Sequence, residues 1–157
     1  MRKIILCLAT ALAITALSAQ PAHYHNSRQG ANNHHLTFYE LPVSAQTFVN
    51  TYFDRNDIKS IDKDRSRGHT SYNVRFRDNS RVKFSADGDW EKVHLSRYDV
   101  PRRLMPPRIH YYVSQTYPGE VLMTVERRGR HWIVELSDGM KLKFDSSGNL
   151  KKIIDKF

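Results

Sequence analysis

The chain carries one pattern twice, as YNVRFRDNSRVKFSADGDWEKV at residues 72–93 and as WIVELSDGMKLKFDSSGNLKKI at residues 132–153. The two stretches align without a gap at an offset of 60 residues. Identical positions are Val74/Val134, Asp78/Asp138, Lys83/Lys143, Phe84/Phe144, Gly88/Gly148 and Lys92/Lys152. A repeat of this length predicts a repeated structural unit. It predicts architecture and carries no information about a reaction.

Both stretches alternate apolar and polar side chains. Residues 72–77 alternate, the turn Asp78-Asn79 follows, and residues 81–84 alternate again before the turn Asp87-Gly88. The second stretch repeats this order around Asp138-Gly139. Alternation with a period of two, bounded by Asn or Asp-Gly turns, is typical of antiparallel hairpins with one apolar face. We therefore expect three consecutive strands in each stretch.

A helix is expected before each set of strands. Leu41-Pro42 opens the first, because proline suits the first turn of a helix, where its missing N–H is harmless. The apolar residues that follow form one stripe at helical spacing: Leu41, Ala45, Phe48, Val49 and Tyr52. Pro106-Pro107 opens the second helix, and Pro118-Gly119 ends it. Such stripes favour packing against a sheet over a cofactor site.

One further strand is expected between each helix and its hairpins, at residues 57–63 and 121–127. The second of these alternates cleanly, whereas Ile58 and Ile61 in the first do not, which leaves the register of that strand open. The first copy is longer by four residues, and we place the difference in a loop at residues 63–68.

The predicted fold class is α+β, with two tandem helix-plus-four-strand units that form one antiparallel sheet with two helices on one face. Repeat one spans about residues 41–95 and repeat two about residues 104–155, with residues 96–104 as the connector. We expect a single domain over residues 37–157, because each half alone would bury too little surface to be stable.

The first 19 residues are typical of a cleaved signal peptide. Arg2 and Lys3 precede an apolar run, and the small residues Ser18-Ala19 suit cleavage. The run is shorter than the roughly 20 apolar residues of a membrane span, and an uncleaved anchor is the alternative. The only cysteine, Cys7, lies in this run, so the mature chain has no thiol. We expect a periplasmic or secreted protein with no stable membrane span after cleavage.

Residues 20–36 form a polar, irregular tract, which predicts a disordered leader. It holds four weak candidates for metal ligands, His23, His25, His34 and His35. The tract contains no Cys, Asp or Glu that would complete a site or orient the imidazoles. A linker is therefore the favoured interpretation, and metal capture by the leader is the alternative.

The proline starts of the helices, the turns Phe-Ser-Ala-Asp-Gly-Asp and Phe-Asp-Ser-Ser-Gly-Asn, and the Tyr/Trp-x-Val strands resemble the β-lactamase-inhibitor-like, PepSY-like proteins of bacterial envelopes. The resemblance covers roughly residues 41–153. It implies a periplasmic or secreted protein with two tandem units and no catalytic residues. Two positions depart between the copies: Asn79 stands opposite Gly139, and Asp54 stands opposite Pro118. Asn tolerates left-handed geometry, whereas Asp54 leaves the end of the first helix open.

No motif for catalysis or for a cofactor is present. In a calcium loop built around Gly88 or Gly148, Lys83 or Lys143 would occupy the first ligand position, where a lysine cannot bind the ion. The histidines are scattered, and no serine stands in a G-x-S-x-G elbow. We therefore expect no enzyme, no cofactor and hairpin turns at both glycines.

The formal net charge of the chain is +9, which favours anionic partners. By alternation, the outward sheet face carries the candidate partner-binding residues Arg75, Arg77, Arg81, Lys83, Lys141 and Lys143. Arginine presents fixed donor forks to carboxylates and phosphates. The alternative interpretation is a solvated face whose charges suppress strand aggregation.

The resulting hypothesis is a non-catalytic exported binding protein whose open, basic antiparallel sheet face receives an acidic protein or an anionic envelope polymer. An inhibitor of a periplasmic or secreted hydrolase and a metal-binding leader are the alternatives. Nucleic acid is not expected, because the chain carries an export signal and lacks exposed aromatics at matching positions. Arg75 and Arg77 correspond to Glu135 and Ser137, so binding should be weighted toward the first copy.

Overall fold

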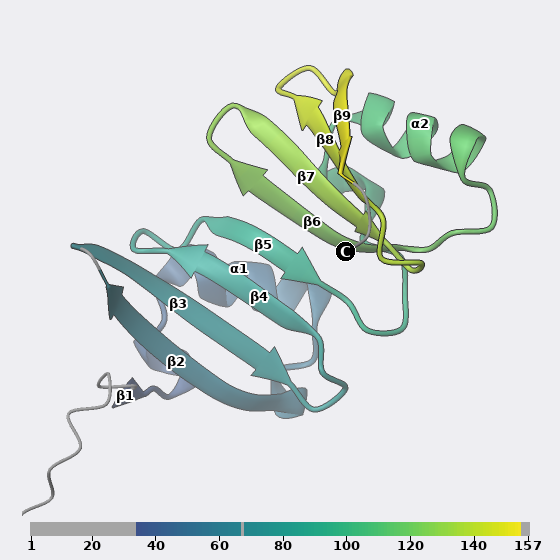
Figure 1. Ribbon diagram of the computed structural model, residues 1–157. Coiled ribbons are helices and arrows are strands. Elements are labelled where there is room, and N and C mark those ends of the chain that lie inside the picture. Colours follow the sequence, from purple (N-terminus) through teal and green to yellow (C-terminus); the bar gives the residue numbers. More distant parts are fainter. Residues whose placement is uncertain (1–33, 67, 155–157) are drawn as a thin grey trace, which may run out of the picture. The chain divides into compact units, whose positions relative to one another are not determined.

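The computed structural model describes residues 34–66 and 68–154 (Figure 1). The expected signal peptide at residues 1–19 and the candidate ligands His23 and His25 lie outside the described residues.

Nine strands form one antiparallel sheet in which every strand pairs with its neighbours in sequence. The strands are β1 (His34–His35), β2 (Ile58–Ser66), β3 (His69–Phe76), β4 (Arg81–Ser85), β5 (Trp90–His94), β6 (Leu122–Arg128), β7 (His131–Leu136), β8 (Lys141–Asp145) and β9 (Leu150–Ile154). Because consecutive strands pair directly, every connection within the sheet except that from β1 to β2 and that from β5 to β6 is a hairpin turn. The prediction of an α+β fold with one antiparallel sheet is confirmed.

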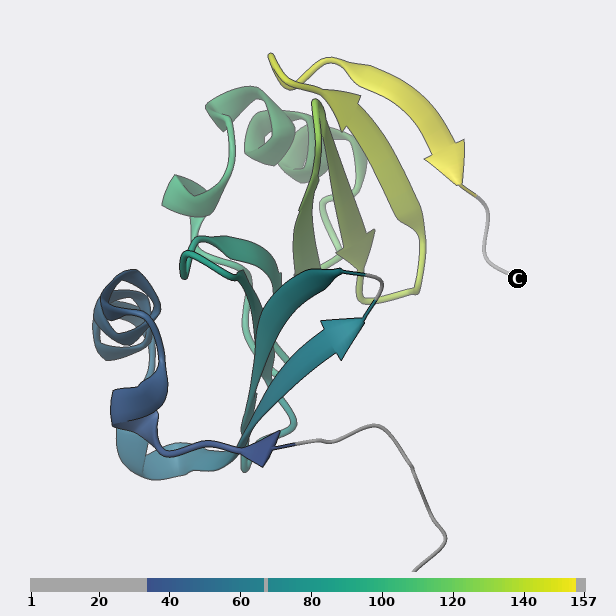
Figure 2. The same cartoon turned by 90° about the vertical axis from the view of Figure 1, so that its left-hand side faces the viewer.

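Two α-helices, α1 (Val43–Tyr52) and α2 (Pro107–Thr116), pack on the same side of this sheet (Figure 2). Phe48 of α1 meets Phe84 edge to face at 5.5 Å between ring centroids, and Tyr112 of α2 meets Phe144 in the same way at 5.6 Å. The described part of the chain also holds three short 3₁₀ helices, at Phe38–Glu40, Arg55–Asp57 and Arg102–Leu104.

The core lies between the helices and the inner sheet face. The register aligns one apolar residue from each of seven successive strands: Val74, Val82, Val93, Val125, Val134, Leu142 and Ile153. All of them except Ile153 are buried and belong to a single hydrophobic cluster that includes residues of both helices. The alternation that places these side chains inward places the polar side chains of the same strands outward.

A β-bulge in β2 explains the broken alternation at its start. The pairing with β3 shifts between Ile58 and Ser60, so an extra residue on β2 faces a single partner position. This shift lets Ile58 and Ile61 both pack on the core, although they lie three residues apart.

The expected loop at residues 63–68 is wrong for most of its length. β2 continues to Ser66 and pairs residue by residue with β3 as far as His69. A hairpin with solvated side chains on both faces still satisfies its backbone N–H and C=O groups, so the polar sequence does not prevent strand pairing.

The end of the predicted leader also differs from expectation. His34 and His35 form β1, paired with Lys63 and Asp62, and the Leu36 N–H donates to the Ile61 carbonyl at 2.8 Å. The edge of β2 offers unpaired backbone groups, and the adjoining chain satisfies some of them.

The two departures between the copies have local explanations. Asn79 adopts φ 71° and Gly139 adopts φ 87°, so both occupy the left-handed region that the turn requires. Asp54 caps the short helix that follows α1, because its carboxylate accepts the Asn56 N–H at 2.8 Å. α1 therefore ends at Tyr52 without the proline that follows α2.

Candidate functional site

The outer sheet face, which we define as the face away from α1 and α2, carries two registered rows of side chains that are polar except for Ile133. The arginine row consists of Arg75, Arg81, His94, Thr124, Glu135 and Lys141, each opposite the next on adjacent strands. The lysine row consists of Asn73, Lys83, Lys92, Glu126, Ile133 and Lys143. The rows lie two residues apart along each strand, which is a distance of about 7 Å.

Like charges face each other at the start of both rows. Arg75 lies directly opposite Arg81, and Lys83 lies directly opposite Lys92. Like charges at directly opposed positions of an antiparallel pair destabilise it, because their side chains are close neighbours. Strands β3, β4 and β5 therefore present four cations in a compact block.

Nearby acids neutralise this block only in part. Lys83 pairs with Glu91 at 2.9 Å, Lys92 with Glu126 at 3.4 Å, and the half-exposed Arg75 with Asp62 at 3.8 Å. Within residues 34–66 and 68–154, the Arg81 side chain has no ion pair or hydrogen bond. Only the Lys83–Glu91 pair is exposed on both sides, and such pairs contribute little free energy, so an incoming anion can compete for Lys83. Asp62 and Glu126 are largely buried, so their ion pairs with Arg75 and Lys92 are harder to replace.

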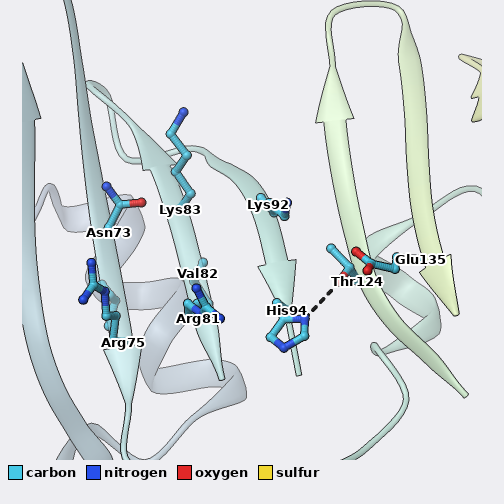
Figure 3. A pocket seen from close by; sticks show the side chains of 10 residues that line it. Asn73, Arg75, Arg81, Val82, Lys83, Lys92, His94, Thr124 and Glu135 are labelled. Carbon is cyan, nitrogen blue, oxygen red and sulfur yellow. Dashed lines mark hydrogen bonds between the residues drawn. The ribbon is translucent and has the colours of Figure 1, made fainter. Parts of the chain in front are cut away.

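The block lines a hollow of about 380 Å³ in the outer face (Figure 3). Residues from five strands, β3 to β7, line it: Asn73, Val74, Arg75, Arg81, Val82, Lys83, Lys92, His94, Thr124 and Glu135. Figure 3 shows the cations on the β3–β5 side and Glu135 on the opposite side. The hollow thus spans the junction between the strands that follow α1 and those that follow α2.

His94 lies at this junction. Its Nδ1 is 2.9 Å from the Thr124 hydroxyl oxygen, across the β5–β6 pairing (Figure 3). Burial of the imidazole, and then the positive charge of Arg81, lower the pKa of His94 from its ordinary value. The ring is therefore neutral at neutral pH, and it can become a cation when an anion offsets Arg81.

Acidic residues balance the strands that follow α2. Glu135 forms an ion pair with Lys141 at 3.8 Å. Glu126 forms ion pairs with Arg128 at 2.6 Å and with Lys92. These contacts leave the β6–β8 part of the face mixed in charge, in contrast to the cationic block on β3–β5.

The structure brings together three of the six residues predicted from sequence. Arg75, Arg81 and Lys83 line the same hollow. Arg77 follows the end of β3 and lies outside both rows. Lys141 and Lys143 lie on the outer face of β8, four strands and about 19 Å from β4.

Lys92 and His94 were missed because of a second β-bulge. The β4–β5 pairing shifts between Lys83 and Phe84, which turns Trp90 and Val93 inward and Lys92 outward. The sequence does contain a sign of this bulge. Trp90 and Val93 are large apolar residues three positions apart in a short strand, and strict alternation cannot bury both.

The described residues hold no constellation typical of catalysis or metal binding. Over residues 34–66 and 68–154, no group of three or more His, Cys, Asp or Glu side chains is placed to hold a metal ion. The Thr124 hydroxyl touches an imidazole, but Thr124 is only 3% exposed, so a substrate could hardly reach it as a nucleophile.

Known proteins give this arrangement a context. The sequence model of one protein family, described as "putative beta-lactamase-inhibitor-like, PepSY-like", matches residues 70–152, which is more than half of the chain. No curated protein matches the chain. Neither helix in the described part of the chain is long and apolar enough to span a bilayer.

Three solved structures are similar over most of their length. A protein of Bacteroides vulgatus described as periplasmic is 29% identical, with a TM-score of 0.73, and the match covers 79% of this chain and 98% of that chain. A second B. vulgatus protein is 25% identical, with a TM-score of 0.71 and coverage of 76% and 95%. A protein of Bacteroides thetaiotaomicron described as a "putative calcium-regulated periplasmic protein" is 28% identical, with a TM-score of 0.74 and coverage of 78% and 97%.

Proposed function

The chain belongs to the beta-lactamase-inhibitor-like, PepSY-like family, and on that premise we propose that it is a non-catalytic, exported protein that binds an acidic partner through its outer sheet face. The partner is an acidic protein or an anionic polymer of the envelope. The proposal is carried by one observation, the block of opposed cations on β3–β5 around a hollow. The opposed cations repel each other in the free protein. An anion placed between them relieves this repulsion, which makes the binding free energy more favourable.

Export and the absence of catalysis are parts of this proposal. The three similar structures are described as periplasmic, and the first residues of the chain have the pattern of a signal peptide. The buried hydroxyl of Thr124 and the scattered histidines favour binding over turnover.

We infer further that the chain consists of two tandem copies of one unit. The order of one α-helix and four strands occurs at α1 to β5 and again at α2 to β9. Binding is then weighted toward the first copy, because Arg75 stands where the second copy has Glu135.

A periplasmic or secreted hydrolase is one candidate for the acidic partner, since the family is described as inhibitor-like. Inhibition would be a special case of binding by the same face. Similarity of fold alone does not transfer inhibition to this chain.

Calcium dependence, which the B. thetaiotaomicron description raises, is not part of the proposal. The turn carboxylates are already used by their own turns. Asp78 accepts the Ser80 N–H at 2.8 Å, and Asp145 accepts the N–H groups of Ser147 and Asn149 at 3.0 and 2.9 Å. These bonds stabilise hairpins, as the sequence predicts for such turns.

The test is retention of envelope components by the mature protein at low and high salt. Reversal of Arg75, Arg77 and Arg81 to Glu should abolish a salt-sensitive interaction, because it replaces two of the four cations of the block, and the Arg77 that follows β3, with carboxylates. Arg97, Arg102 and Arg130 are exposed and lie outside both rows, so their reversal to Glu is the matched control with the same change of net charge.

Equal loss in both triple variants would mean that net charge alone drives retention. Unchanged retention by the Arg75, Arg77 and Arg81 variant would overturn the proposal.

A further inference from the structure

The cationic block has a defined geometry that restricts what it can bind. Arg81 and Lys83 stand two residues apart on β4, with Arg75 and Lys92 opposite them on β3 and β5. The separation of the two rows along the strand is about 7 Å, which is also the separation of alternate side chains on any extended peptide. A ligand that lies along β4 in an extended conformation therefore meets the two rows with its side chains at positions i and i+2.

We propose that this block, together with His94, binds an extended acidic peptide segment whose two acidic side chains, at positions i and i+2, place one carboxylate on the arginine row and one on the lysine row. The inference rests on the proposed function and deepens it, because it identifies the acidic partner as a protein and not as an anionic polymer. Arg75 and Arg81 hold the first carboxylate between their guanidinium groups, and Lys83 and Lys92 hold the second.

The local charges favour this mode of binding. The two lysines exchange contacts with Glu91 and Glu126 for the ligand carboxylate, and Glu126 keeps Arg128 as a partner. Arg81 gains a partner where its side chain makes no ion pair with another described residue. The net gain in ion pairs therefore comes from Arg81, since Arg75, Lys83 and Lys92 exchange contacts that they already make.

His94 makes the first carboxylate position sensitive to protons. The ring stands beside Arg81 in the arginine row, and the charged groups that act on it are Arg81 and Lys92, which lower its pKa, and Glu135 and Asp78, which raise it. Lys83 and Glu126 are nearby charged side chains in the lysine row. The Nδ1 atom of His94 is hydrogen-bonded to the Thr124 hydroxyl. A bound carboxylate offsets Arg81 and raises the pKa of His94, so binding takes up protons as the pH falls.

The test uses the full chain and two blocked peptides of identical composition. Gly-Gly-Glu-Gly-Glu-Gly-Gly places its carboxylates at i and i+2, whereas Gly-Gly-Glu-Glu-Gly-Gly-Gly places them at i and i+1, on opposite sides of an extended chain. In an NMR titration at low ionic strength, we expect the first peptide to bind about fivefold more tightly, which is the scale of one additional exposed ion pair.

Arg81→Gln should bring the ratio of the two affinities to about one, whereas Arg130→Gln, outside both rows, should leave it unchanged. The His94 ring signals should titrate at higher pH in the presence of the first peptide.

Equal affinities for the two isomers would overturn the two-row site, and so would a preference that survives Arg81→Gln. Binding to vesicles of phosphatidylglycerol by a protein that ignores both peptides would also overturn it, since the partner would then be an anionic surface. In each of these outcomes the arginine reversals in envelope retention still test the proposed function separately.

Discussion

We compare the first half of the molecule, α1 with β2 to β5, with the second half, α2 with β6 to β9. The same aligned positions face the helices in both halves, but the halves differ in what lies beside their last strand. Val93 on β5 is 1% exposed, because β6 continues the sheet beside it, whereas the aligned Ile153 on β9 is 42% exposed at the edge of the sheet. One sequence position is therefore core in one half and surface in the other. The difference shows that burial of a repeated residue depends on the next strand as well as on its own unit.

The largest expected effect comes from placing a lysine at these two aligned positions. Val93→Lys buries an ammonium group without a partner and should cost about 4 kcal/mol of unfolding free energy or prevent folding. Ile153→Lys adds a charge to an open strand edge and should cost about 0.5 kcal/mol or less. Urea unfolding followed by circular dichroism gives both values. Similar losses in the two variants would show that another chain covers the β9 edge in solution.

Gly88 and Gly148 give the next largest difference. Both have left-handed backbones, with φ 87° and 84°. A Cβ on Gly88 would lie 2.7 Å from Pro42 Cβ and would also overlap the Ser44 hydroxyl, whereas a Cβ on Gly148 would lie 3.0 Å from Arg108 Cβ. Gly88→Ala should therefore cost about 3 kcal/mol and Gly148→Ala about 2 kcal/mol, because each adds backbone strain and the first adds more overlap with its helix.

A glycine in open space separates these two contributions. Gly129 has φ 59°, and nothing lies within 4 Å of its ideal Cβ. Gly129→Ala measures backbone strain alone and should cost about 1 kcal/mol in the same urea experiment. If all three variants lost the same stability, the close approach of each helix start to its turn would contribute nothing.

Local patterns were sufficient to predict most of the fold. Alternation around Asp78-Asn79 and Asp138-Gly139 predicted the hairpins, and the prolines at 42 and 107 predicted where the helices begin. The apolar stripes of both helices and the apolar sheet face require each other, which placed the helices on one side. The outward position of Arg75, Arg81 and Lys83 followed from the same alternation.

What the sequence missed depends on pairing between distant strands. The bulge that turns Lys92 and His94 outward arises in the β4–β5 ladder, and the contact of His94 with Thr124 arises from the pairing of β5 with β6. β1 forms only because the edge of β2 accepts it. Each of these features needs the register of a neighbouring strand, which composition and local periodicity do not contain.

The junction of the halves offers a smaller effect. Trp90 of the first half lies 6.0 Å from Trp132 of the second, and the Arg127 guanidinium lies 5.3 Å from the Trp90 ring centroid. Leu150 is the residue aligned with Trp90. Trp90→Leu gives the first half the residue of the second and should cost about 1.5 kcal/mol, because it removes the ring contacts with Phe48 and Trp132 and one cation–π contact.

A double-mutant cycle with Arg127→Gln separates these two kinds of contact. We expect a coupling of about 0.5 kcal/mol between Trp90 and Arg127 in urea unfolding. Strict additivity of the two changes would show that the guanidinium does not bind the indole and that the halves are held by the sheet and the ring contact alone.

The smallest effect concerns pH and the aligned pair His94 and Ile154. The folded pKa of His94 lies below its unfolded value, so between these two values the unfolded chain binds more protons than the folded chain. The lowered pKa of His94 therefore does not affect the free energy of unfolding above its unfolded pKa. It reduces that free energy as the pH falls toward the folded pKa. Ile154 has no titratable side chain, so at this aligned position only the first half makes the free energy of unfolding depend on pH.

His94→Gln removes this term and keeps a polar side chain that can bond the buried Thr124 hydroxyl. Plotted against pH from 7.5 to 5, the unfolding free energy of the variant should fall less than that of the parent chain. A steeper fall in His94→Gln would mean that the ring is charged in the folded protein, and the proton uptake expected on carboxylate binding would then disappear, because the cation at the junction would already be present.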